Sequence, residues 1–156
     1  MTGKKIYELL LEYGLTVGFA ESMTGGLASY KIVENPGASR VLRGSLVTYN
    51  ESVKYDILGI NYRFMESHGI VSDLVARAMA ESVRMELSAN IGVGITGNAG
   101  PTLQEGVSGR MAYVAVTFGN DTLSEAIFFD QETRVEAIEK TVSLAYRLIE
   151  KILLKN

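Results

Sequence analysis

Apolar side chains recur every three or four residues in several stretches of the chain, which is the spacing of one buried face of an α-helix. Gly14 stops the first stretch, and Ser72 with Asp73 provides a helix start for the long central one. The pattern predicts helices over residues 24–34, 73–88 and 132–154, short ones over 3–13 and 51–58, and a helical turn at 62–67.

Other segments are uniformly apolar or rich in β-branched and aromatic residues, which is typical of strands. The last two of them are joined through Gly119, Asn120 and Asp121, which predicts a hairpin. Helices alternate with the early strands, so we expect those strands to be mainly parallel and the hairpin to add an antiparallel one. The fold class is α/β, a three-layer α/β/α sandwich, and residues 1–156 form a single domain. The predicted strands are 16–20, 41–49, 91–95, 111–118 and 122–129.

Composition excludes several classes of function. Hydrophobic residues make up 47% of the chain and charged residues 21%, which is ordinary for a soluble globular protein. A net charge of −3 without a block of like charges provides no basic face for nucleic acid. Cysteine is absent and His68 is the single histidine, so thiolate chemistry and a multi-histidine metal site within one chain are excluded. We find no signal-peptide core and no apolar run near the ~20 residues of a membrane span, and expect a cytoplasmic protein without membrane partners.

The strongest indication of chemistry lies in residues 17–26, where an apolar strand runs into a turn of small and hydroxylated residues. In α/β proteins the strand fixes such a corner, and the first N–H groups of the following helix can bind an anion. Ser22 lies on this corner, between Glu21 and Thr24. The alternative is that Ser22 or Thr24 only caps the helix.

Two further segments are expected at the same edge, because ligands bind beyond the carboxyl ends of parallel strands. The second strand ends near Tyr49, with Lys54 one helical turn later, and the third ends at Thr96. A long loop with several glycines, residues 96–109, follows, and loops of this length are usually functional or disordered. If the three strands are neighbours, Ser22, Tyr49, Lys54 and Thr96 can converge there.

A serine needs a base before it can act as a nucleophile. Without cysteine and with a badly placed His68, the base must be a lysine, a carboxylate or a tyrosine. Lys54 is the attractive choice, because a lysine desolvated in a cleft can lose its proton near neutral pH. The glycine-rich turns at 25–26 and 97–100 would let backbone N–H groups approach a phosphate or an oxyanion.

Each candidate also has a purely structural interpretation. Tyr49 can simply end a strand at the surface, and Lys54 can be a solvated lysine on a short helix. Thr96 can cap its loop, and Arg134 can be a surface residue at the start of the last helix with no role in binding. Spacing alone leaves both interpretations open.

Five ordered motifs at matching separations, covering about residues 4–153, resemble the C-terminal domain of the competence/damage-inducible protein CinA family. They are Ala20-Glu21-Ser22-Met23-Thr24-Gly25-Gly26, similar to A-E-S-C-T-G-G; Asn35-Pro36-Gly37-Ala38-Ser39, similar to P-G-A-S; Val47-Thr48-Tyr49-Asn50 with Lys54 and Leu58-Gly59, similar to V-T-Y-S…K…L-G; His68-Gly69-Ile70-Val71-Ser72, similar to H-G-A-V-S; and Thr96-Gly97-Asn98-Ala99-Gly100-Pro101, similar to T-G-I-A-G-P.

The resemblance implies an amidase that hydrolyses the carboxamide of nicotinamide mononucleotide to nicotinic acid mononucleotide and ammonia. Ser22 would be the nucleophile and Lys54 its base, with Tyr49 and Thr96 in the polar network around them. A five-stranded mixed, mainly parallel sheet, no metal or cofactor requirement and a homo-oligomer are also implied. Many relatives have a second, N-terminal domain, which we expect this chain to lack. The expected substrate-binding residues are Glu21, Thr24, Gly25, Gly26, Gly97, Asn98, Ala99, Gly100 and Arg134.

Three positions depart from the family pattern. Met23 replaces the usual cysteine, and residues 102–109 lack the lysine of a K-P-V-G run. The last helix has Arg134 at the first of two arginine positions but Ile138 at the second. These losses remove positive charge where a phosphate would lie. They favour an alternative, a non-catalytic relative that binds a nucleotide or a partner protein, whereas the retained polar residues favour the amidase.

Overall fold

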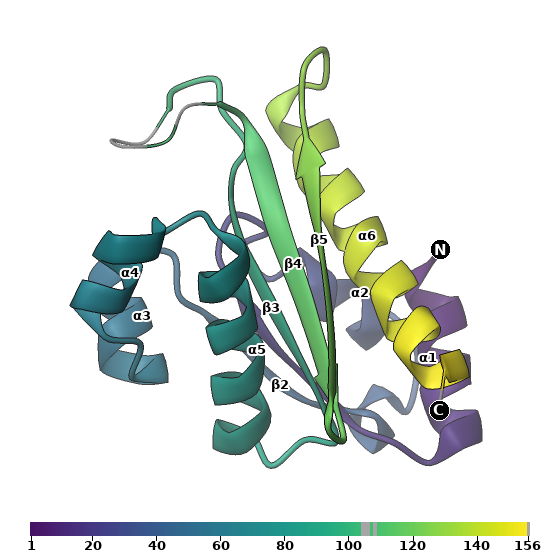
Figure 1. Ribbon diagram of the computed structural model, residues 1–156. Helices are drawn as coiled ribbons and strands as arrows, with labels where there is room; N and C mark the ends of the chain where they lie inside the picture. Colours follow the sequence, from purple (N-terminus) through teal and green to yellow (C-terminus); the bar gives the residue numbers. More distant parts are fainter. Residues whose placement is uncertain (104–106, 108, 156) are drawn as a thin grey trace.

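The computed structural model describes residues 1–103, 107 and 109–155, and in it a five-stranded sheet lies between two helical layers (Figure 1). The strand order is β2-β1-β3-β4-β5. β1 pairs in parallel with β2 and β3, and β4 runs antiparallel to β3 and β5. The predicted α/β/α sandwich with a mixed sheet and an antiparallel hairpin is confirmed. The strands are β1 (Val17–Glu21), β2 (Leu42–Val47), β3 (Ile91–Asn98), β4 (Met111–Phe118) and β5 (Asp121–Phe128).

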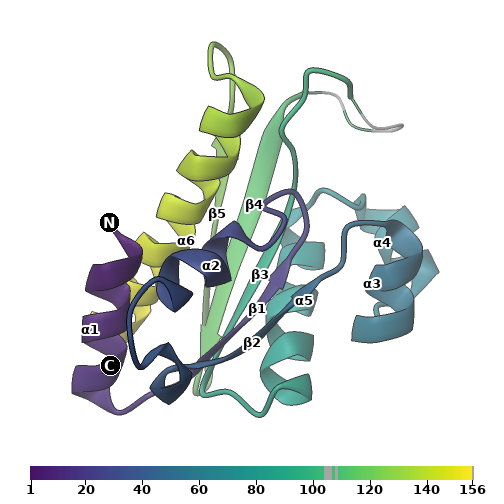
Figure 2. The ribbon, with the colours of Figure 1, turned by 180° about the vertical axis from the view of Figure 1, so that it is seen from behind.

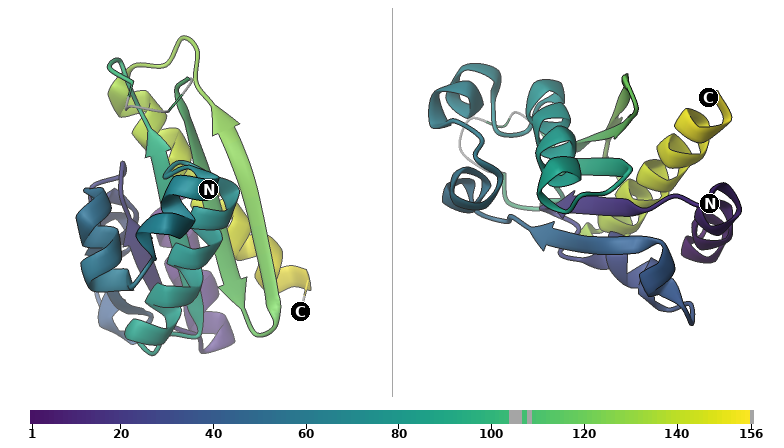
Figure 3. Two further views of the ribbon diagram at one scale, coloured as in Figure 1. Left: turned by 60° about the vertical axis from the view of Figure 1, so that its left-hand side comes forward. Right: turned by 90° about the horizontal axis from the view of Figure 1, so that it is seen from below.

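The helices divide between the two faces of the sheet, as the view from behind and the view from below show (Figure 2, Figure 3). One layer holds α1 (Gly3–Tyr13), α2 (Leu27–Val33) and α6 (Arg134–Lys155). The other holds α3 (Glu51–Leu58), α4 (Tyr62–His68) and α5 (Asp73–Glu86), and a short 3₁₀ helix, η1 (Ala38–Arg40), precedes β2. None of the helices in the described ranges has the length and apolar character that crossing a membrane needs.

Alternation along β1 supplies side chains to both cores. Val17 and Phe19 belong to the larger cluster under α1, α2 and α6, whereas Ala20 belongs to the smaller one with α5. Because successive strand residues point to opposite faces, Glu21 follows Phe19 to the α2 side and Ser22 is directed to the α3 side. The pleat of β1 therefore decides which helical layer each residue of the corner meets.

Helix α5 packs closely on β3 because strand residues that face it are glycines. A Cβ at Gly94 would lie 2.2 Å from the carbonyl oxygen of Ala76, and one at Gly92 would lie 2.1 Å from that of Ala80. A side chain at either position would push the helix away from the sheet. The two glycines thus set the short distance between α5 and the sheet.

Two boundaries differ from the sequence prediction by three residues, more than any of the others. β3 continues to Asn98, because Thr96, Gly97 and Asn98 pair in register with Tyr113, Ala112 and Met111 of β4. The predicted loop therefore begins at Ala99, not at Thr96, and its residues 104–106 and 108 lie outside the described part of the chain. The predicted helix over 24–34 begins only at Leu27, because the residues before it form a turn around the carboxylate of Glu21.

Candidate active site

Lys54 from α3 reaches the corner that follows β1. Its Nζ lies 3.1 Å from Ser22 Oγ and also donates to the carbonyl oxygen of Thr48 at 2.6 Å. Parallel pairing places Glu21 beside Val47, so the carboxyl ends of β1 and β2 lie next to each other. Helix α3, which carries Lys54, follows β2 at this edge of the sheet. Lys54 is 1% exposed and Ser22 is 6% exposed. The structure therefore brings these two predicted residues into hydrogen-bond contact, out of bulk water.

Burial lowers the pKa of Lys54 from 10.5 to about 8, because desolvation penalises the ammonium form. The negative charge of Glu51, at the start of α3, acts in the opposite direction and limits the shift. A lysine with a pKa near 8 is partly neutral close to physiological pH and can accept a proton. The alternative interpretation, in which Lys54 is an ordinary solvated lysine, is wrong.

Glu21 is fully buried, and its carboxylate accepts six hydrogen bonds from the turn, from α2 and from β2. Four of the donors are N–H or O–H groups at the start of α2, so a side chain of this chain already fills that helix end. The expectation of free N–H groups for an anion at the start of this helix is therefore wrong. The donors are Thr24 Oγ1 at 2.8 Å, Gly26 N at 3.2 Å, Ala28 N at 2.9 Å, Ser29 N at 3.2 Å, Ser29 Oγ at 2.9 Å and Ser45 Oγ at 2.7 Å.

The helix-cap alternative for Ser22 and Thr24 is also resolved. The N-cap position of α2 is Gly26, and it makes no side-chain cap hydrogen bond. Thr24 donates its hydroxyl proton to Glu21, and the carbonyl oxygen of Ser22 accepts from Gly25 N at 3.1 Å. The serine hydroxyl is therefore left to face Lys54 instead of the helix.

Arg134, at the start of α6, connects two other segments of the site through hydrogen bonds. Its Nη1 donates to the carbonyl oxygen of Gly100 at 2.6 Å, and its Nη2 donates to Tyr49 Oη at 2.9 Å. Tyr49 is 52% exposed, so this pair lies at the mouth of the site. Behind it is a cavity of about 210 Å³, lined by Ser22, Met23, Tyr49, Gly97, Asn98, Ala99, Thr102 and Arg134.

Gly97 and Met23 form a tight internal contact beneath this cavity. A Cβ at Gly97 would lie 2.4 Å from Met23 Sδ and 2.7 Å from the Cβ of Ala112, so no larger residue fits. Met23 is buried and also lies 4.0 Å, sulfur to hydroxyl, from Thr141 of α6. The methionine at the position of the family's cysteine therefore packs the base of the corner.

Thr96 is the predicted member that the structure directs elsewhere. It is buried, and its hydroxyl donates to the carbonyl oxygen of Ile70 at 2.7 Å. Within the described residues, no hydrogen bond joins Thr96 to Ser22 or Lys54. The side chain ties the segment between α4 and α5 to the end of β3, next to the pair but outside it.

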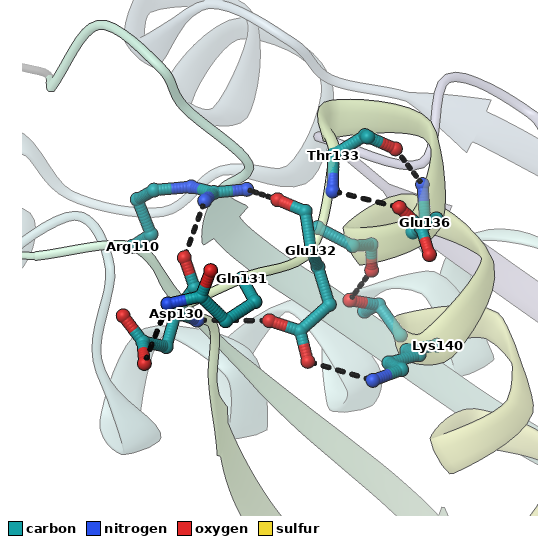
Figure 4. Close-up of polar contacts among 9 residues, drawn as sticks. Arg110, Asp130, Gln131, Glu132, Thr133, Glu136 and Lys140 are labelled. Atoms are coloured by element: carbon teal, nitrogen blue, oxygen red, sulfur yellow. Dashed lines mark hydrogen bonds and ion pairs between the residues drawn. The ribbon is translucent and has the colours of Figure 1, made fainter.

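The start of α6 is fixed by a capping box that the sequence analysis missed (Figure 4). Thr133 Oγ1 accepts from Glu136 N at 3.2 Å, and Glu136 Oε1 accepts from Thr133 N at 3.0 Å. The spacing of a threonine and a glutamate three residues apart could have revealed it. This cap holds the first turn of α6, and with it Arg134.

Arg110, just before β4, is a second residue that the sequence analysis missed. Its Nε donates to the carbonyl oxygen of Ala99 at 3.0 Å. Its Nη2 donates to the carbonyl oxygen of Glu132 at 2.6 Å (Figure 4). The guanidinium thereby connects two segments that wall the cavity. No local pattern marks an arginine for this role, because both acceptors are backbone groups far away in the sequence.

Other hollows of the molecule lack this chemistry. One of about 550 Å³ between α3, α4 and α5 is mainly apolar, and one of about 610 Å³ lies beside α4. Neither is lined by Ser22 or Lys54. His68 ends α4 and packs edge-on against Phe64 at 4.7 Å. In the part of the chain that the structure describes, no three His, Cys, Asp or Glu side chains group to hold a metal ion.

The fold and the site together define an α/β/α protein with a serine–lysine pair at the carboxyl edge of its parallel strands, in which the serine lines a small polar cavity. The chain belongs to the CinA C-terminal domain family, whose model matches residues 2–153. It is 32% identical over 152 residues, 97% of its length, to a Streptococcus thermophilus protein named "Putative competence-damage inducible protein". A Desulforamulus reducens protein of the same name is 44% identical over 110 residues. The matches cover 36% and 27% of these two relatives, so the chain spans about a third of their length.

Solved structures of the same superfamily share the whole fold. The competence or damage-inducible protein from Enterobacter asburiae superposes with a TM-score of 0.90 at 26% identity, over 97% of this chain and 95% of that one. The competence/damage inducible protein CihA from Agrobacterium tumefaciens gives a TM-score of 0.90 at 29% identity, over 99% and 93%. The family membership and the fold thus rest on independent comparisons of sequence and structure.

Proposed function

We propose that this protein is an amidohydrolase that converts nicotinamide mononucleotide to nicotinic acid mononucleotide and ammonia. The observation that carries the proposal is the 3.1 Å contact between Ser22 Oγ and the buried Nζ of Lys54. A serine next to a lysine whose pKa is lowered to about 8 is an activated nucleophile with its base. Membership of the CinA C-terminal domain family agrees with the motifs that suggest this activity.

In the first half-reaction, neutral Lys54 accepts the hydroxyl proton of Ser22, and Oγ attacks the carboxamide carbon. The carbonyl π electrons move to the oxygen and form a tetrahedral oxyanion. When the oxyanion collapses, the C–N bond breaks and the amide nitrogen takes the proton from Lys54, so that ammonia leaves. The carbonyl oxygen of Thr48 keeps Nζ in position throughout.

In the second half-reaction, Lys54 accepts a proton from water, and the hydroxide attacks the ester formed on Ser22. The bond from the carbonyl carbon to Oγ breaks, and Oγ regains a proton from Lys54. The product is the carboxylic acid of the nucleotide, and the enzyme returns to its first state. One lysine therefore serves as base and acid in both halves.

Arg134 is the cation placed to receive the phosphate of a nucleotide. It is exposed at the mouth of the cavity, and among the described residues two of its guanidinium nitrogens are engaged, by Gly100 and Tyr49. An arginine fork binds phosphate oxygens well, and helix α6 begins at this residue. Residues 97–100 would then contact the nicotinamide end of the substrate. These substrate contacts, the homo-oligomer and the cytoplasmic location stay predictions.

A second candidate, a non-catalytic nucleotide-binding protein, is favoured by one observation. Arg134 is already bonded to Gly100 and Tyr49, and Ile138 occupies the position one helical turn later where the family pattern has another arginine. Because the mouth of the cavity carries less positive charge, it binds a phosphate less strongly. A nucleotide can then bind without being turned over.

The deciding experiment measures ammonia release from nicotinamide mononucleotide by the purified protein, with Ser22→Ala as the matched control. The amidase proposal expects steady release by the unmodified protein and a loss of at least about 1,000-fold in the variant, because the attacking oxygen is gone. Both proteins should melt at similar temperatures, since the variant removes one hydroxyl. Calorimetric binding of the nucleotide without any ammonia release would instead establish the second candidate.

A further inference from the structure

Asn98 carries a feature that neither the fold nor the serine–lysine pair explains. Among the described residues, its Nδ2 is the one buried side-chain nitrogen or oxygen without a hydrogen-bond partner. The residue is only 4% exposed, at the last position of β3. Buried polar groups are nearly always hydrogen-bonded, so an unpaired one points to a partner that the protein alone does not supply.

The orientation of the amide group follows from its neighbour. Oδ1 of Asn98 accepts from the backbone N–H of Gly100 at 2.9 Å. The flipped amide would set two donors against each other, so the unpaired atom must be the nitrogen. Asn98 therefore presents N–H donors and needs an acceptor.

The pleat of β3 places Asn98 on the same side of the sheet as Ser22. Gly97 faces Met23, so Asn98 points to the opposite face, together with Thr96. Parallel pairing sets Ala20 beside Gly94 as the last pair of the ladder, and Ser22 follows two residues after Ala20, just beyond the end of β1. Asn98 and Ser22 line the same cavity of about 210 Å³.

We propose that Asn98 Nδ2 donates a hydrogen bond to the carboxamide oxygen of the substrate and stabilises the oxyanion formed there, an inference that rests on the proposed amidase function. As the bond from Ser22 Oγ to carbon forms, the carbonyl π pair moves onto this oxygen. When that pair returns, the C–N bond breaks and the nitrogen leaves as ammonia with the proton from Lys54. A fixed donor at this oxygen binds the transition state more strongly than the neutral amide.

A carbonyl oxygen fits this donor better than a phosphate does. The Asn98 amide is neutral and shielded from solvent, whereas Arg134 at the exposed mouth offers a charge. The motif that residues 96–101 resemble has isoleucine at this position, so the donor adds to the backbone N–H groups of the site. Its loss should therefore cost less than the loss of Ser22.

The first test replaces the donor alone. Asn98→Asp keeps an oxygen for Gly100 N but offers no N–H, and kcat at the high-pH plateau should fall about 10- to 100-fold with KM changed less than about threefold. Asn98→Leu removes the donor without adding charge and should lose a similar factor. Asn90→Asp is the matched control, because Asn90 bonds Thr16 at the opposite end of the sheet and its change should leave kcat unaltered. If Asn98→Asp and Asn98→Leu both keep kcat within threefold, the inference is overturned.

The second test needs no turnover. In the Ser22→Ala protein, the side-chain amide signals of Asn98 are assigned by their loss in Asn98→Asp and followed by NMR as nicotinamide mononucleotide is added. We expect these signals to shift with the nucleotide and to stay in place with ribose 5-phosphate, which lacks the carboxamide. Equal shifts with both compounds would overturn the inference in favour of a phosphate contact.

The two tests separate this inference from the proposed function. If the Asn98 signals shift only with the nucleotide and the unmodified protein releases no ammonia, the carboxamide contact is supported and the amidase proposal is overturned. Ammonia release with unmoved Asn98 signals overturns the contact and leaves the amidase standing. If neither is observed, both proposals fail.

Discussion

Glu21 and Lys54 are buried ionisable residues on either side of Ser22, and the protein surrounds them with very different numbers of hydrogen-bond partners. The Glu21 carboxylate accepts six hydrogen bonds, which tie the turn after β1 to α2 and β2. Within the described part of the chain, Nζ of Lys54 donates to Ser22 Oγ and to the carbonyl oxygen of Thr48, and burial lowers the pKa of Lys54 to about 8. Glu21 fixes the corner through its hydrogen bonds, whereas Lys54 can give up its proton. At this one corner of the fold, Glu21 supports the structure and Lys54 is the residue suited to chemistry.

The largest expected effect comes from removing the base. Lys54→Met should reduce kcat/KM for nicotinamide mononucleotide by about 1,000-fold or more, because general-base catalysis alone contributes up to about 10⁴-fold. In the unmodified protein, kcat/KM should rise with pH and level off above about 8, where Lys54 becomes neutral. Steady-state ammonia release across pH 6–10 measures both. A variant that keeps more than a tenth of the activity contradicts the role of Lys54.

The next largest effect is on stability, at Glu21. Glu21→Gln replaces an acceptor oxygen by an NH₂ group that faces several donors, so the free energy of unfolding should fall by about 3 kcal/mol or more. The matched control is Ser45→Ala, which removes one of the six donors and should cost about 1 kcal/mol. Urea denaturation of the three proteins gives both values. Equal losses in the two variants would show that Glu21 is not the anchor of the corner.

Sequence reasoning reached the fold and the serine–lysine pair for physical reasons. Periodicity located the helices, and Gly119 with Asn120 marked the hairpin turn between β4 and β5. The shared edge of parallel strands predicted that Ser22 and Lys54 would meet. These features depend on local pattern and on topology, both of which leave a trace along the chain.

The supporting contacts could not be predicted in the same way. Glu21 lies one residue before Ser22, and only the pleat of β1 shows that it points to α2 instead of into the cavity. Thr96 turns to Ile70, and Arg110 bridges Ala99 and Glu132, through backbone acceptors that any sequence would offer. Such contacts are decided by tertiary packing and carry no residue pattern of their own.

The smallest expected effect concerns how stability depends on pH. Because the folded-state pKa of Lys54 is about 8 and its ordinary value is 10.5, the unfolded chain binds more protons between these pH values, and stability contributed by this residue rises with pH. The cost of burying the charged amine is full below pH 8 and fades toward 10.5. Between pH 7 and 10, the unfolding free energy of the unmodified protein should therefore rise by roughly 2 kcal/mol relative to Lys54→Met.

The slope with pH is the informative quantity, because Lys54→Met also removes the donor to Thr48 and shifts the whole curve by a constant. Lys4→Met is the control: Lys4 is 74% exposed in its ion pair with Glu8, so its removal changes the net charge equally but relieves no buried amine. Denaturation curves at several pH values give the three slopes. If the curves of Lys54→Met and the unmodified protein run parallel from pH 7 to 10, the amine is not desolvated, and the contrast between Lys54 and Glu21 fails.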